Sequence, residues 1–234
     1  MRHLSAIVGI LAFAGFVIAG VPADAVAQGG GSIVGEVKYA GTPAAPKVLK
    51  VNKDNQACGT EKNSEEWVVG GNGGVKNAVA TVVGAKGPAL KPSQKPVLDQ
   101  KGCQFSPHVI LVPAGAEMDI LNPDGVLHNL HTFSTANPSF NKAQPKFKKV
   151  MTEKFDKAEI VKIQCDAHGW MSGWIVVQDH PYYAVSGDDG SFKIDNVPAG
   201  KHTVQLWHES GAKLTKEVEV KAGQPTKVTF ELKK

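Results

Sequence analysis

The sequence predicts an all-β protein, and three observations support this fold class. Short segments in which apolar and polar residues alternate recur along the chain, as they do in half-buried strands. Glycine, proline and asparagine, the residues of tight turns, separate these segments at short intervals. No segment shows the apolar period of a long amphipathic helix. We therefore expect the chain to form β-sandwiches.

The expected strands follow one another from residue 32 to the end of the chain. The glycine cluster at 70–74 lacks the Lys-Ser/Thr ending of a phosphate-binding loop, so we expect a hairpin turn around Asn72. The strands are expected at 32–39, 67–69, 75–83, 105–115, 117–121, 159–165, 173–177, 183–185, 192–194, 201–207, 216–220 and 227–232. In the lysine-rich segment 141–162, the side chains expected to point inward are Phe147, Val150 and Phe155.

The N-terminal segment has the pattern of a secretory signal peptide. Arg2 precedes an apolar run at 4–21, and Ala25 and Ala27 form a small-x-small cleavage pattern. A membrane anchor is the alternative, but the run barely reaches spanning length and no basic stop-transfer flank follows it. We expect residues 1–27 to be removed and the mature protein to be periplasmic or secreted, with no membrane span.

Composition limits the classes of partner. The formal net charge is +4, from 26 lysines and arginines against 22 aspartates and glutamates. Arg2 is the only arginine, so the mature chain carries its positive charge on lysine. The mature chain therefore has no arginine that could bind a phosphate or a guanine through two hydrogen bonds, and we expect no nucleic-acid binding.

A thiol, an imidazole and a thioether lie close together in the run Cys-Asp-Ala-His-Gly-Trp-Met at 165–171. One Cys and two His in a plane with a distant axial Met form the ligand set of electron-transfer copper sites. His128, after the strand at 117–121 and a short loop, supplies the second imidazole. A buried core thiol and a gap-filling methionine are the structural alternatives, and the histidine midway between them weakens both. The expected ligands are His128, Cys165, His168 and Met171.

The chain has three cysteines, and export permits disulfides. Pairing of Cys58 with Cys103 leaves Cys165 free for a metal. Closing a loop of this length stabilises a fold by about 4 kcal/mol in the chain-entropy model. In the alternative, Cys103 is a second metal thiolate. A binuclear copper centre draws both cysteines from one loop, so we favour the disulfide.

The stretch 103–178 resembles the cupredoxins, the blue copper proteins, and is most similar to their amicyanin group. Three features carry the resemblance: the strand at 105–115 with its proline and glycine, the His-Asn-x-His run at 128–131, and the short Cys-x-x-His-x-x-Met loop. Two positions depart from the amicyanin pattern. Gly169 replaces a proline, and Trp170 replaces a smaller aromatic residue.

This resemblance implies a Greek-key β-sandwich that holds one type 1 copper. It also implies that the amide of Asn129 hydrogen-bonds the thiolate sulfur and ties the two ligand loops together. Trp170 beside His168 is expected either to fill the end of the sandwich or to form part of a docking patch. In the second case, an exposed imidazole edge is the shortest route from copper to solvent. The remaining histidines of the mature chain are not expected to be ligands: His108, His131, His180, His202 and His208.

The segment 179–234 resembles the carboxypeptidase-regulatory-like, or transthyretin-like, family in its Asp-Gly-Ser-Phe run at 189–192 and its Val-Pro-Ala-Gly-Lys run at 197–201. That family is a structural or interaction module, and no catalytic set is visible here. The strand at 32–39 also looks like the opening strand of such a domain. The expected division is a signal peptide at 1–27, an N-terminal β region at 32–100 that packs with the C-terminal sandwich, a copper-binding core at 101–178, and the C-terminal sandwich at 179–234.

We therefore expect an exported type 1 copper protein that carries single electrons between redox partners, with an unidentified cytochrome or dehydrogenase as the partner protein. The alternatives are a copper carrier or buffer, and a β-sandwich interaction module with a non-redox metal site. A catalytic copper enzyme is the least favoured class, because it needs an open coordination position or a second copper. We expect no enzyme activity.

Overall fold

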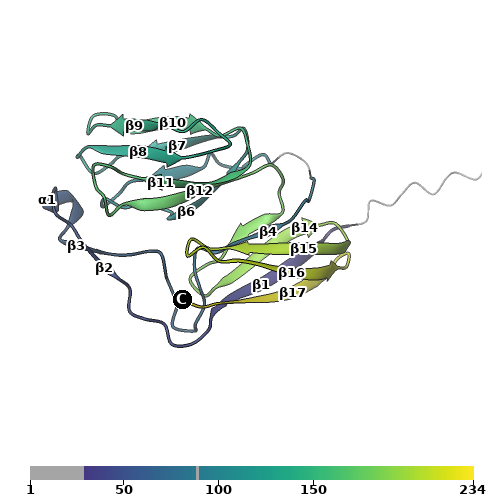
Figure 1. Ribbon diagram of the computed structural model, residues 1–234. Coiled ribbons are helices and arrows are strands. Elements are labelled where there is room, and N and C mark those ends of the chain that lie inside the picture. Colours follow the sequence, from purple (N-terminus) through teal and green to yellow (C-terminus); the bar gives the residue numbers. More distant parts are fainter. Residues whose placement is uncertain (1–28, 88–89) are drawn as a thin grey trace, which may run out of the picture.

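The computed structural model describes residues 29–87 and 90–234 and confirms the all-β fold class (Figure 1). The expected signal peptide lies outside these residues. In the described part of the chain, no helix is long and apolar enough to span a membrane. The elements are β1 (Gly31–Tyr39), β2 (Val48–Lys50), α1 (Asn55–Cys58), β3 (Glu61–Asn63), β4 (Val79–Val82), β5 (Val97–Asp99), β6 (Val109–Pro113), β7 (Glu117–Leu121), β8 (His128–Phe133), β9 (Asn141–Gln144), β10 (Val150–Lys154), β11 (Glu159–Gln164), β12 (Ser172–Gln178), β13 (Tyr183–Val185), β14 (Ser191–Val197), β15 (Gly200–Trp207), β16 (Lys213–Val220) and β17 (Pro225–Leu232).

Two sheets form the upper sandwich in Figure 1. One has the strand order β6-β12-β11-β8-β9 and the other has the order β10-β7-β5. Alternation buries one face of β7, where Met118 and Ile120 are fully buried while Glu117 is exposed. These two side chains pack in one apolar core with Phe105, Leu130 and Ile163. The β6–β12 side of the five-stranded sheet faces the second sandwich.

The lower sandwich combines strands from both ends of the chain. Its sheets have the orders β14-β1-β17 and β13-β4-β15-β16, around a separate apolar core. β1 runs parallel to β17 and antiparallel to β14, as the expected packing of the N-terminal strand against the C-terminal strands requires. Among the described strands, β2 pairs with β3 in a sheet of its own. The domain limits drawn from the sequence stay a prediction.

Several expected strands differ in length or position. The hairpin turn at 70–74 is present, with Val69 bridged to Val75, but the strand expected at 75–83 is reduced to β4. Asn77 has a positive φ of 65°, a conformation that interrupts a strand. The expectation of inward-pointing Phe147 and Val150 was wrong: they are 81% and 50% exposed, because they lie in and directly after the connection that crosses from β9 of one sheet to β10 of the other. Phe155 is buried as expected.

A third apolar cluster joins the two sandwiches. It contains Val79 and Trp207 from the lower sandwich and Val109 and Val176 from the upper one. Trp207 meets Trp174 edge to face, with ring centroids 4.9 Å apart. This contact fixes the relative position of the two sandwiches.

Beside this cluster, Glu209 of the lower sandwich binds two side chains of the upper one. Its carboxylate accepts hydrogen bonds from Trp174 Nε1 at 3.0 Å and from His108 Nε2 at 2.5 Å. Burial lowers the pKa of His108, but Glu209 and Glu65 outweigh this effect and leave the pKa above its ordinary value. Burial raises the pKa of Glu209, and His108 reverses the effect and lowers it. The expected structural role of His108 is therefore that of a buried ion-pair partner.

We predict that Glu209→Gln lowers the free energy of unfolding by about 3 kcal/mol at pH 6, since it removes the closer of the two carboxylates that balance the buried charge of His108. His108 has a raised pKa, so its contribution is complete below about pH 6.5 and is lost as the pH rises through the folded-state pKa. The loss in the variant should therefore shrink at pH 9. Urea unfolding of both proteins at the two pH values measures it. The exposed Glu217→Gln is the control, and an equal loss at both pH values would contradict the prediction.

Candidate metal centre

A tight loop between two paired strands carries three of the expected ligands. β11 and β12 are antiparallel, and their last pair is Gln164 with Ser172. The intervening loop is closed by backbone hydrogen bonds, from Cys165 N to Met171 O at 3.1 Å and from Met171 N to His168 O at 2.8 Å. The loop is therefore held in one conformation at the end of the sheet.

The second imidazole comes from the neighbouring strand. β8 begins at His128 and pairs with β11, so this side chain lies beside the ligand loop. His128 Nδ1 and His168 Nδ1 are 3.0 Å apart, and they lie 3.9 and 3.8 Å from Cys165 Sγ. Metal bonds of about 2.0 Å to nitrogen and 2.3 Å to sulfur allow separations up to about 4.3 Å. The three atoms can therefore bind one ion.

Burial encloses this candidate site. His128, Cys165 and His168 are fully inaccessible to solvent, and Met171 is 1% exposed on the same loop. In the described residues, the other two groups that could hold a metal both include Cys58 or Cys103. Those two cysteines form a disulfide, which makes them unsuitable as thiolate ligands. The expected disulfide is thus present, and the alternative of Cys103 as a second thiolate is wrong.

The environment of the sulfur combines burial with directed amides. Burial raises the pKa of the Cys165 thiol, and the backbone amides of Asn129, His168 and Ala167 only partly oppose this. Asn129 Oδ1 lies 3.3 Å from the sulfur and accepts a hydrogen bond from Ala167 N at 3.0 Å. The Asn129 side chain thus ties β8 to the ligand loop. Metal binding here has to release the thiol proton.

Each imidazole contacts a carboxylate through its second nitrogen. His128 Nε2 lies 3.0 Å from Asp124 Oδ2, and His168 Nε2 lies 2.9 Å from Asp54 Oδ2. Carboxylate partners of this kind place the proton on Nε2 and leave the Nδ1 lone pair for a metal. Burial lowers the pKa of His128 despite its carboxylate partner. Both histidines are therefore oriented for metal binding through Nδ1.

The two aspartates were not identified from the sequence. Asp124 stands four residues before His128, a spacing that could have indicated it. Asp54 is 114 positions from His168, and no local pattern connects them. The loop around Asp124 is well supported, because its carboxylate also accepts hydrogen bonds from the backbone of Gly102 and Cys103, both at 2.7 Å.

The structure does not show the exposed imidazole edge that the sequence suggested. His168 is covered by Asp54 and by Trp170, whose ring centroid lies 5.0 Å from that of the imidazole. Trp170 is half-buried and donates a hydrogen bond from Nε1 to the carbonyl of Cys103 at 3.2 Å. It therefore packs over the site, and its use in docking stays a prediction.

The other histidines lie apart from this cluster. His131 binds the surface carboxylate of Asp166 at 3.1 Å and stacks on Phe133. His202 donates to the carbonyl of Pro198, and His208 contacts Ser210. None of these contacts involves a candidate ligand.

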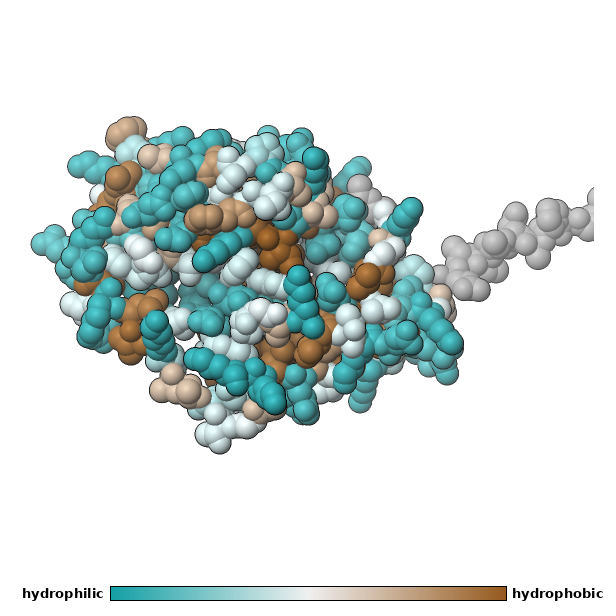
Figure 2. Space-filling model, viewed as in Figure 1, coloured by the Kyte–Doolittle hydropathy of each residue, from teal (hydrophilic) through white to brown (hydrophobic). Residues whose placement is uncertain are grey.

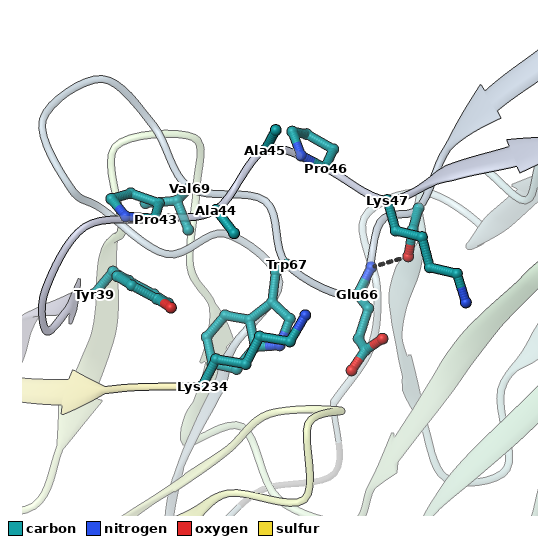
Figure 3. Close-up of a pocket in the computed structure, with 11 residues that line it drawn as sticks. Tyr39, Pro43, Ala44, Ala45, Pro46, Lys47, Glu66, Trp67, Val69 and Lys234 are labelled. Atoms are coloured by element: carbon teal, nitrogen blue, oxygen red, sulfur yellow. Dashed lines mark hydrogen bonds between the residues drawn. The ribbon is translucent and has the colours of Figure 1, made fainter.

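Figure 3 shows a separate hollow, lined by Tyr39, Trp67 and the segment 43–47. Its volume is about 40 Å³, whereas about 10–15 Å³ by this measure suffices for one water. It is too small to enclose an organic ligand. The face in Figure 2 is mainly hydrophilic, and its hydrophobic residues form separate small groups.

Residues 162–228 match a family model described as polysaccharide lyase family 4, domain II. The match begins in β11 and ends in β17, and it covers less than half of the chain, so it does not assign the protein to that family. No curated protein matches the chain. The resemblance of the C-terminal segment to carboxypeptidase-regulatory-like domains stays a prediction.

Solved structures of copper proteins are similar to part of the chain. A purple cupredoxin from Nitrosopumilus maritimus is 19% identical with a TM-score of 0.31, over 36% of this chain and 100% of that one. A Cu(I) amicyanin mutant is 19% identical with a TM-score of 0.34, over 42% and 98%. A nitrite reductase from Thermus scotoductus is 25% identical with a TM-score of 0.32, over 41% and 24%. These TM-scores are too low to assign a fold or a function to the chain.

We predict one free thiol per chain, Cys165, in the unreduced protein after denaturation. In the folded, metal-free protein this thiol should react with a disulfide reagent at least tenfold more slowly than after denaturation, because it is buried and its pKa is raised. A chromogenic thiol assay with and without denaturant measures both. Three reactive thiols, or equally fast reaction of the folded protein, would contradict the prediction.

Proposed function

We propose that the protein is an exported type 1 copper protein that carries single electrons between redox proteins. The observation that carries the proposal is the buried cluster of one cysteine sulfur and two imidazole Nδ1 atoms within 4.8 Å of one another. This donor set, together with a methionine on the same loop, is that of electron-transfer copper sites. The pattern of residues 1–27 supports the exported location.

His128, Cys165 and His168 would hold the ion, together with Met171 from the same loop. Copper, when bound there, supplies a centre that gains and loses one electron. The chain's own part is to keep the donor atoms in place. The paired strands and the hydrogen-bonded ligand loop resist movement, and a site that rearranges little exchanges electrons fast.

The same burial disfavours the alternative functions. A copper carrier or buffer has to release its ion, and exposed ligands serve that purpose better than this enclosed set. An enzyme needs an open position for substrate, whereas all four candidate ligands are at most 1% exposed. We therefore propose a carrier of electrons without catalytic activity. Its partner would be another redox protein. Because the mature chain has no arginine, we expect it not to bind nucleic acid.

We predict that the mature protein reconstituted with copper shows an intense visible band at about 600 nm, the copper-thiolate transition of such sites. Cys165→Ser should abolish the band, because the sulfur is its origin. His128→Gln should also abolish it or reduce it by more than half. Absorption and electron paramagnetic resonance spectra measure these effects.

The matched control is His131→Gln on the same strand, since His131 points to Asp166 and should leave the spectrum unchanged. A colourless copper-loaded protein, or a band that persists in Cys165→Ser, would refute the electron-carrier proposal. It would favour the copper buffer or the interaction module instead.

A further inference from the structure

Residues 51–60 form a cap over His168 that adds no strand to either sandwich, although its Val51 and Cys58 pack into the apolar core of the upper one. The cap contains α1 and lies at one end of the upper sandwich in Figure 1. Asp54 occupies the N-cap position, where an aspartate normally bonds the amides of its own helix. Here its side chain makes no capping hydrogen bond. It reaches His168 Nε2 at 2.9 Å instead.

The conformation of Asp54 supports this unusual use. Its φ is 51°, in the left-handed region that non-glycine residues seldom adopt. Its backbone carbonyl accepts hydrogen bonds from Ala57 and Cys58, each at 2.9 Å, so the residue is fixed in place. The carboxylate is therefore held against the imidazole, although it is 43% exposed to solvent.

One disulfide connects the supports of both imidazoles. Cys58 ends α1 and is bonded to Cys103. The Cys103 amide donates to Asp124, whose carboxylate contacts His128 Nε2. The cap that carries Asp54 and the loop that carries Asp124 are thus joined through a single covalent link beside the candidate ligands.

We propose that Asp54 is a positioning residue of the copper site, which orients His168 through Nε2 and favours the higher charge state of the bound ion. This inference rests on the proposed function. A fixed negative charge beside the ligand interacts more strongly with Cu(II) than with Cu(I). It also holds the ring in the tautomer that presents Nδ1, and loss of such a partner typically costs 10-fold to 100-fold in metal affinity.

The test uses two variants of the full mature protein. Asp54→Asn keeps the shape and an accepting oxygen but removes the charge. We expect it to shift the ratio of Cu(II) to Cu(I) affinity about tenfold toward Cu(I), which raises the midpoint potential by about 59 mV. Asp54→Ala also removes the acceptor, and we expect it to weaken Cu(II) binding at least tenfold in competition with a chelator.

The matched control is Asp195→Asn on β14. It removes the same charge from an exposed carboxylate of the lower sandwich. In the described chain this carboxylate forms an ion pair with Lys193. The variant should change neither the midpoint potential nor the Cu(II) affinity. Far-ultraviolet circular dichroism checks the fold of each variant. Should the Asp54 variants fail to fold, the double variant Cys58→Ala, Cys103→Ala releases the cap with Asp54 intact. We expect it to weaken Cu(II) binding in the same direction.

Two failures can be told apart. A wild-type protein without the blue band refutes the proposed function, and zinc affinity, measured by the same competition, then tests the positioning of His168 on its own. A blue wild type whose potential and metal affinity are unchanged in both Asp54 variants refutes the role of Asp54 and leaves the proposed function standing.

Discussion

The pairing of β11 with both β8 and β12 is the constraint on which the site depends. Gln164, the last residue of β11, is paired with His131 on one side and Ser172 on the other. Cys165, the first residue of the ligand loop, therefore lies beside β8, the strand that begins with His128. A slip of one residue in either register would turn alternate side chains to the opposite face of the sheet and separate the ligands.

How much of the site can be predicted depends on how far apart its parts are in sequence. Cys165, His168 and Met171 lie within one short run, so their spacing alone indicates a metal loop. His128 could be identified because a strand and a turn are predicted directly before it. Asp54 lies far from all of them and comes near through the Cys58–Cys103 link. The expectation of an exposed imidazole failed for this reason, because it considered only the residues of the sandwich.

The errors in the fold have a similar origin. Alternation correctly indicated strands, since it reflects local burial on one face. It could not show whether a second layer covers that face. Phe147 lies in the connection from β9 of one sheet to β10 of the other, outside the strands, and its side chain is exposed. His108 directly precedes β6, and its carboxylate partners, Glu209 and Glu65, lie about 100 and about 40 positions away, so no local pattern in the sequence indicates its burial.

The carboxylates also explain why two imidazoles can be buried at such close range. An unpaired buried N–H group costs free energy, and Asp54 and Asp124 satisfy both Nε2 protons. With the protons there, the two Nδ1 lone pairs face each other at 3.0 Å and repel. A cation bound to both nitrogens and to the Cys165 sulfur replaces that repulsion with attraction. The hydrogen bonds on the outer side of the rings thus make the inner side a site for a metal ion, and they do so with residues that belong to three separate segments of the chain.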